Sequence, residues 1–311
     1  ARALARQVAQ VLAAVPDGEV LEFGPGSGAL AAELLAELDL LGCAPRRYLM
    51  LELSAELQQR QREAIAERVP HLAGRVVWLE RLPERLAGVV IANEVLDAMP
   101  ARRFRVSDRG IAELFVTSAG DGLTLLDGPL QDERLAARVA ALDLPPGYES
   151  EVNFAAEAWV RTVCEHLQRG LLLLIDYGYA QAEYYHPQRH TGTLQCHYRQ
   201  RAHGDALLWP GLQDITAHVD FTAMAQAGCQ VGATLAGFAT QAQFLINCGL
   251  PQLLEAIDPT DPTYLDLALQ ARQLLLPQAM GEAFKVLALT RGMDDGDGLI
   301  GFASGDRRHR L

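Results

Sequence analysis

The sequence has little positive charge. It contains 27 lysines and arginines against 39 aspartates and glutamates, and Lys285 is its only lysine. The formal net charge of −12 provides no general basic field, so we do not expect nucleic acid as a partner. A protein or a small molecule is the expected partner.

Cysteine is also scarce, and its spacing contains no C-x-x-C pair. The five residues are scattered, which argues against a disulfide framework and a zinc site and favours a reducing compartment; they are Cys43, Cys164, Cys196, Cys229 and Cys248. No apolar run reaches the roughly 18 residues of a membrane span. We therefore expect a soluble, cytoplasmic protein.

The first 15 residues already have a helical pattern, with no Ser, Thr, Asp or Asn ahead of them to cap the helix. We therefore expect the chain to begin inside a longer protein.

A glycine-rich turn follows the first predicted strand. The stretch from Val20 to Leu30 reads VLEFGPGSGAL, with Gly24, Gly26 and Gly28 on alternate positions before a predicted helix. Such a turn lets the backbone approach a ligand closely. Glu22, just before it, would repel a pyrophosphate but could pair with an ammonium group. The stretch favours S-adenosylmethionine and leaves a dinucleotide, or a turn without a ligand, as alternatives.

A second carboxylate ends the next predicted strand. Glu52 ends the predicted strand that begins at residue 47, where an acidic residue of a doubly wound fold can accept both ribose hydroxyls. We place Leu53 beside it in the predicted cofactor site. An acid at this position fits NAD and S-adenosylmethionine equally, and a solvated strand-end glutamate is the structural alternative.

The fourth predicted strand, residues 88–92, leads into a polar turn that contains Asn93, Glu94 and Asp97. Ligands of open α/β sheets bind outside the carboxyl ends of the strands, so we take Glu94 and Asp97 as the leading catalytic candidates and Asn93 as a cofactor contact. A loop salt bridge or a helix cap would be the structural explanation of the same two carboxylates.

Three additions to the alternating strand and helix pattern are expected in what we take as a single domain. Residues 102–130 alternate with period two, which indicates an antiparallel meander. Residues 180–219 lack periodicity and predict a long loop over the active site. Asp214 and His218, in or beside this loop, could position a substrate; histidine spacings here match no usual metal pattern, so no metal is expected. Residues 239–280 predict a helical insertion before the last strands.

Seven strands are predicted in total, with the glycine turn after the first, an acid after the second and an antiparallel finish. Besides the strands above, they include residues 76–79, 170–175, 230–235 and 284–289. The pattern predicts an α/β fold with a Rossmann-like, seven-stranded mixed sheet, as in class I S-adenosylmethionine-dependent methyltransferases. A dehydrogenase would need a second half or a separate catalytic domain.

Several stretches together resemble the MidA family of S-adenosylmethionine-dependent methyltransferases, across essentially the whole chain. They are EFGPGSG at 22–28, NEVLDAMP at 93–100, IDYG at 175–178, residues 213–221, GFATQAQFL at 237–245 and MGEAFKVL at 280–287. The sequence differs in having Val95, Leu96 and Met99 where members often have Phe and Leu. It also lacks the family's N-terminal segment, which carries a Gly-Asp-Phe-x-Thr-type stretch.

The resemblance implies protein arginine methylation. Mitochondrial-matrix members are complex I assembly factors that form symmetric dimethylarginine, so we expect a protein substrate with a target arginine. Glu94 and Asp97 would pair with its guanidinium, and His218 or Asp214 would accept the released proton. An assembly or scaffold factor that binds a partner protein, and a small-molecule methyltransferase, are the alternatives. The sequence does not predict the oligomeric state.

Overall fold

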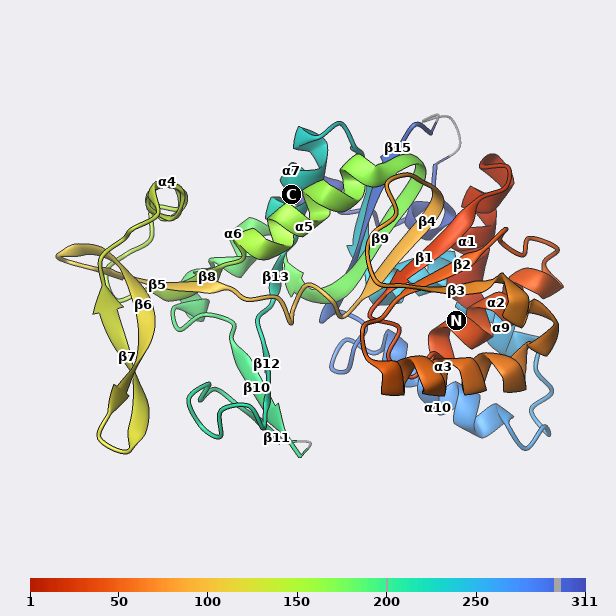
Figure 1. The fold of residues 1–311 in the computed structure, drawn as a ribbon, viewed down its shortest axis with the longest axis horizontal. Coiled ribbons are helices and arrows are strands. Elements are labelled where there is room, and N and C mark those ends of the chain that lie inside the picture. The colour runs from red at the N-terminus through yellow and green to blue at the C-terminus, as the bar shows by residue number, and fades with distance from the viewer. Residues whose placement is uncertain (200, 294–297) are drawn as a thin grey trace. The chain divides into compact units, whose positions relative to one another are not determined.

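Seven strands follow one another across the main sheet of the computed structural model, which describes residues 1–199, 201–293 and 298–311 (Figure 1). Their order is β14 (Thr234–Thr240), β15 (Phe284–Arg291), β9 (Leu167–Tyr179), β4 (Leu86–Asn93), β1 (Glu19–Phe23), β2 (Tyr48–Leu51) and β3 (Val76–Leu79). Only β15 runs antiparallel to its neighbours on this path. This topology confirms the predicted class I fold.

The described chain divides into two compact units. The core unit comprises residues 1–95, 160–177 and 225–311, and the insert unit comprises residues 96–159 and 178–224. Each unit is described by itself below.

Both faces of the main sheet are covered, which explains its apolar strands. All five residues of β1 are buried. Val89 and Ile91 of β4 belong to a core cluster formed with helices on one face. On the other face, Gly228 lies so close to Leu289 and Cys164 that an added Cβ would stand 2.6 Å from the leucine. Alternate side chains of each strand therefore pack into two separate hydrophobic layers, one on each face of the sheet.

Helices of the core unit connect these strands. They are α1 (Arg2–Ala14), α2 (Ala29–Leu40), α3 (Ala55–Arg68), η1 (Pro70–Arg75), α5 (Phe154–His166, which begins in the insert unit), α7 (Phe221–Gln230, likewise), α8 (Gln241–Asn247), α9 (Leu250–Glu255), α10 (Tyr264–Leu275), η3 (Ile300–Phe302) and η4 (Arg308–Arg310). Ser54 caps α3, because its Oγ accepts a hydrogen bond from the Leu57 N–H. Within the described ranges, no helix is long and apolar enough to cross a bilayer.

The sixth strand of the main sheet begins later than predicted. We expected residues 230–235, whereas α7 extends to Gln230 and β14 begins at Thr234. Gly232 adopts φ of 87° and the Ala233 N–H bonds to the Gly228 carbonyl, which is how helices commonly end. This helix end occupies the first residues that the sequence assigned to the strand.

The insert unit contains the predicted antiparallel meander as part of a four-stranded sheet. Its order is β7 (Gly122–Gly128), β6 (Gly110–Ala119), β5 (Arg102–Ser107) and β8 (Glu149–Val152). The sequence did not predict β8, because its two glutamates do not suggest a strand that pairs with β5. The helix α4 (Glu133–Ala141) packs Leu135 and Val139 into the core of this unit.

Residues 180–219 carry more regular structure than the predicted loop. They contain α6 (Gln181–Tyr184), η2 (Pro187–Arg189), and a small sheet of β11 (Arg201–His203), β10 (Gln195–Tyr198) and β12 (Asp214–Thr216). The next strand, β13 (Val219–Asp220), pairs with Gly178 and Tyr179 of β9. These strands are too short to show a period in the sequence.

Candidate active site

The glycine turn joins β1 to α2, and all three glycines have positive φ. The values are 58° for Gly24, 51° for Gly26 and 81° for Gly28, a region that side chains disfavour. A Cβ added to Gly26 would meet no atom within 4 Å, whereas one added to Gly28 would stand 2.9 Å from the Gln61 Cα. Gly28 is thus required by packing, and Gly26 leaves open space above the backbone.

Gln61 connects this turn to the second strand and was not among the predicted site residues. It is fully buried on α3, and its Nε2 donates to the Gly26 carbonyl at 2.8 Å and to Glu52 Oε2 at 3.4 Å. Trp78 Nε1 donates to the Gln61 Oε1 at 2.8 Å. A sequence signal was present, because Gln61 and Ile65 are one helical turn apart and share the buried side of α3.

Glu52 lies directly after β2 with an oriented carboxylate. Its Oε1 accepts a hydrogen bond of 2.8 Å from the Ser54 N–H. Leu53 is 74% exposed, an apolar side chain that the protein itself does not cover. A cavity of about 650 Å³ runs along residues 78–84, beginning with the last two residues of the neighbouring strand β3.

Glu22 is more enclosed than its position before a turn suggested. It is 3% exposed, and the Tyr48 hydroxyl donates to its Oε2 at 2.6 Å. Burial raises the pKa of Glu22 to about 7, although the hydrogen bond from Tyr48 opposes this change. Glu22 therefore titrates near neutral pH and would gain from a cation beside it.

Glu94 stands at the carboxyl end of β4 in a strained conformation. Its φ is 53°, in the left-handed region that glutamate rarely adopts, and its N–H bonds to the Ile175 carbonyl at 3.0 Å. The Asn93 side-chain amide donates to Glu94 Oε1 at 3.2 Å, and the Tyr177 hydroxyl donates to Oε2 at 2.8 Å. Such strain gathers at functional sites. Tyr177 was not predicted as a site residue.

The other three predicted catalytic residues belong to the insert unit. Asp97 is 5% exposed, and its carbonyl accepts a hydrogen bond of 2.9 Å from the Ala217 N–H. This bond ties the turn after Leu96 to the residue before His218. Asp214 lies on β12 with an exposed side chain and pairs in register with His197.

The tautomer of His218 follows from its hydrogen bond. Its Nδ1 lies 3.2 Å from the Thr193 carbonyl oxygen, which can only accept, so Nδ1 carries the proton. In the neutral ring, Nε2 is then the basic nitrogen. The ring also stacks on Tyr179, with 5.3 Å between centroids and 18° between planes.

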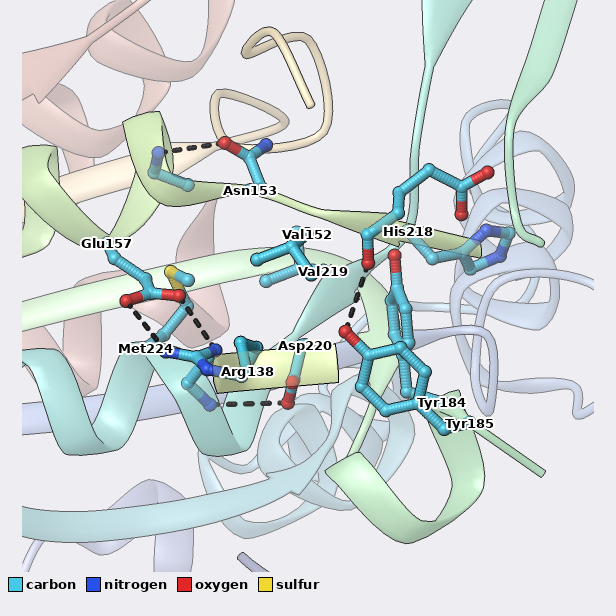
Figure 2. A pocket seen from close by; sticks show the side chains of 13 residues that line it. Arg138, Val152, Asn153, Glu157, Tyr184, Tyr185, His218, Val219, Asp220 and Met224 are labelled. Carbon is cyan, nitrogen blue, oxygen red and sulfur yellow. Dashed lines mark hydrogen bonds and ion pairs between the residues drawn. The ribbon is translucent and has the colours of Figure 1, made fainter. Parts of the chain in front are cut away.

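His218 also lines a small polar cavity of the insert unit (Figure 2). It offers about 10 Å³ to the centre of a water molecule, roughly what one water needs. Arg138 pairs with Glu157 in its wall at 2.9 Å, and Asp220 Oδ1 accepts from the N–H groups of Thr222 and Ala223. The polar interactions around this cavity stabilise the segment of β13, and the cavity itself is too small for a substrate. Across the described ranges, no cluster of three or more His, Cys, Asp or Glu could hold a metal.

Known proteins resemble this chain in sequence and in fold. The family model "Putative S-adenosyl-L-methionine-dependent methyltransferase" matches residues 3–239. A crystal structure from Burkholderia thailandensis, bound to S-adenosyl-homocysteine, is 48% identical with a TM-score of 0.96, covering 100% of this chain and 80% of that one.

Curated relatives include proteins with the name "Protein arginine methyltransferase NDUFAF7, mitochondrial". The one from Mus musculus is 29% identical over 88% of this chain and 67% of its own length. The one from Homo sapiens is 26% identical over 87% of this chain and 66% of its own length. The chain therefore spans about two thirds of these relatives.

The core unit fits the cofactor that these comparisons imply. The turn at Gly26 leaves space that a Cβ would fill, Glu22 is a buried acid that accepts a hydrogen bond from a neutral hydroxyl, and Glu52 is an oriented acid after β2. S-adenosyl-L-methionine is the cofactor, and the predicted resemblance is confirmed. The chain belongs to the family of S-adenosyl-L-methionine-dependent methyltransferases.

Proposed function

We propose that the protein methylates an arginine side chain of a protein substrate, with symmetric dimethylation as the product. The observation that carries this proposal is the Glu94 carboxylate, whose two oxygens are held by Asn93 and Tyr177 at the carboxyl end of the sheet. A fixed carboxylate is a suitable partner for the planar fork of a guanidinium. The names of the mitochondrial relatives support the same substrate class.

The cofactor supplies an electrophilic methyl group, so the protein's task is to hold and orient the two reactants. Residues of the core unit would hold the cofactor: the glycine turn with Glu22 at the methionine end, Glu52 and Leu53 at the nucleoside, and Asn93 between them. Glu94 would orient the guanidinium and favour its positive charge.

Three residues of the insert unit are further candidates for this reaction. Asp97 would give the guanidinium a second carboxylate. His218, with its proton fixed on Nδ1 by Thr193, has a basic Nε2 that would accept the proton released when the methylated nitrogen becomes neutral. Asp214, exposed on β12, is the alternative acceptor.

The test measures methyl transfer from S-adenosyl-L-methionine to arginine-containing proteins by mass spectrometry, using the full-length protein. Glu94→Gln should lower the rate by about a hundredfold, because a neutral amide no longer pairs with the guanidinium. Cofactor affinity, measured by calorimetry, should stay unchanged. Transfer at the parental rate by Glu94→Gln would refute the role of this carboxylate, and a product on a small molecule instead of arginine would refute the substrate class.

A further inference from the structure

A second cavity of the insert unit is lined by three stacked side chains. The guanidinium carbon of Arg189 lies 3.7 Å from the centre of the Tyr179 ring, and His218 stacks on the same ring. The cavity has a volume of about 380 Å³, which is within the size range of ligand sites. Its lining contains no aspartate or glutamate; the other members are Gly192, Thr193, Leu194, Gln195, Ala202, His203 and Gly204.

Arg189 brings a positive charge to this cavity. Its Nη1 donates to the Glu183 carbonyl, and within the described ranges no carboxylate lies at ion-pair distance. Other arginines of this unit differ, since Arg102, Arg105 and Arg138 each pair with a carboxylate. A guanidinium has five N–H donors, so Arg189 keeps most of its hydrogen-bonding capacity.

His203 adds a donor to the same cavity. Its Nδ1 accepts a hydrogen bond from the Asp205 N–H, so the neutral ring carries its proton on Nε2. That Nε2 atom is buried and, as far as the structure describes the chain, has no hydrogen-bond partner. A buried donor without an acceptor is costly, and a ligand oxygen would relieve this cost.

We propose that this cavity binds a carboxylate side chain of the protein substrate, an aspartate or glutamate close in sequence to the methylated arginine. One permanent positive charge balances one carboxylate, whereas a phosphate would bring nearly two negative charges. Arg189 would hold the carboxylate through its fork, and His203 Nε2 would donate to it. That the carboxylate belongs to a protein substrate rests on the proposed function. That the cavity binds a carboxylate rests only on its charge and its hydrogen-bond donors.

The experiment measures binding without methyl transfer. Fluorescein-labelled peptides with one arginine would carry Glu, Gln or phosphoserine at successive positions on either side, and anisotropy with the full-length protein would give their affinities. At one position Glu should bind roughly tenfold more tightly than Gln, as expected for a charge-assisted hydrogen-bonded pair. The preference should vanish in Arg189→Gln and shrink in His203→Leu.

Arg201→Gln is the matched control, because Arg201 is exposed on the same strand as His203 and is not part of the lining. It should keep the preference for Glu. Melting temperature and cofactor binding show whether each variant is folded, and Arg189→Lys, which keeps the charge but loses the fork, should fall between the parent and Arg189→Gln.

Two results would overturn the proposal: equal affinities for the Glu and Gln peptides at every position, or tighter binding of phosphoserine than of Glu. Methylation of the same peptides is scored separately. Binding with the Glu preference but no methylated arginine would refute the proposed function and leave the carboxylate site standing. Methylation with no Glu preference would refute the carboxylate site and leave the proposed function standing.

Discussion

The hydroxyl of Tyr177 donates a hydrogen bond of 2.8 Å to Oε2 of Glu94. The two residues stand at the carboxyl ends of the adjacent parallel strands β9 and β4, where Asn93 pairs in register with Ile175. Phe284 packs against the Tyr177 ring with 4.1 Å between centroids. Residues of two neighbouring strands therefore hold the two oxygens of this carboxylate.

Tyr177→Phe should lower kcat for methyl transfer roughly tenfold, because one charge-assisted hydrogen bond that orients Glu94 is lost. The Phe284 contact keeps the ring in place, so cofactor affinity and melting temperature should hold. Steady-state kinetics on an arginine peptide provides the measurement, with Tyr264→Phe on α10 as the control. An unchanged kcat in Tyr177→Phe would show that Glu94 needs no such support.

Glu52→Ala should weaken binding of S-adenosyl-L-methionine at least tenfold, since two ribose hydroxyls would lose an ionised acceptor. Isothermal titration calorimetry provides the measurement. Glu56→Ala is the control: Glu56 lies in the first turn of α3, is exposed and pairs with Arg60 on the same helix. If both variants bind the cofactor like the parent, the ribose assignment of Glu52 is wrong.

Gly26→Ala should reduce cofactor affinity strongly and stability only modestly. The positive φ costs alanine about 1 kcal/mol. The new methyl group would also project into the space that the cofactor needs in order to approach the protein backbone at this turn. Gly42→Ala is a matched control, with φ of 68° and equally open surroundings. Both variants should lose similar stability in urea, but only Gly26→Ala should lose affinity. Equal cofactor affinities in the two variants would contradict this placement.

Glu22 should make cofactor binding depend on pH near neutrality. Because its pKa is raised to about 7, the carboxylate that would pair with the cofactor's ammonium group forms only as the pH rises through that value. Affinity for S-adenosyl-L-methionine should therefore increase from pH 6 to about pH 8, and Glu22→Gln should remove that increase. Tyr48→Phe should move the midpoint upward, because it removes the hydrogen bond that favours the ionised form. A pH-independent affinity in the parent would exclude the pairing.

Asp220→Asn should stabilise the protein at pH 8. Burial raises the pKa of Asp220 to about 6, so the folded protein binds this proton more tightly than the unfolded chain does. That contribution to stability is complete below the ordinary pKa of 3.8 and is lost as pH rises through 6, a change of about 3 kcal/mol at most. Asparagine keeps the cap of α7 without the buried charge. Urea unfolding at pH 4 and pH 8 should show a gain only at pH 8; a loss at pH 8 would mean that the charge is stabilising.

The sequence predicted the sheet and the glycine turn because both depend on local patterns. The apolar run of β4 and the positive φ of Gly24, Gly26 and Gly28 needed no knowledge of distant residues. The predicted boundaries were wrong at β14, because a helix ends at Gly232, inside the predicted strand.

The supporting residues of the candidate site could not be predicted in this way. Tyr48 lies 26 positions from Glu22, and Tyr177 lies 83 positions from Glu94. Such pairs exist only once the register between parallel strands is set, and the sequence alone did not provide that register. The short strands of residues 180–219 were missed for the related reason that their pairing, not their period, defines them.

The buried Gln61 has a consequence for how the cofactor end of the sheet can move. Because an indole N–H can only donate, Trp78 fixes the amide oxygen on its own side and directs the nitrogen toward Gly26 and Glu52. The turn after β1, the residue after β2 and strand β3 are thus linked through one side chain. A change that loosens any one of them should raise the rate of amide hydrogen exchange in all three. We therefore expect this edge of the sheet to open and close as a unit.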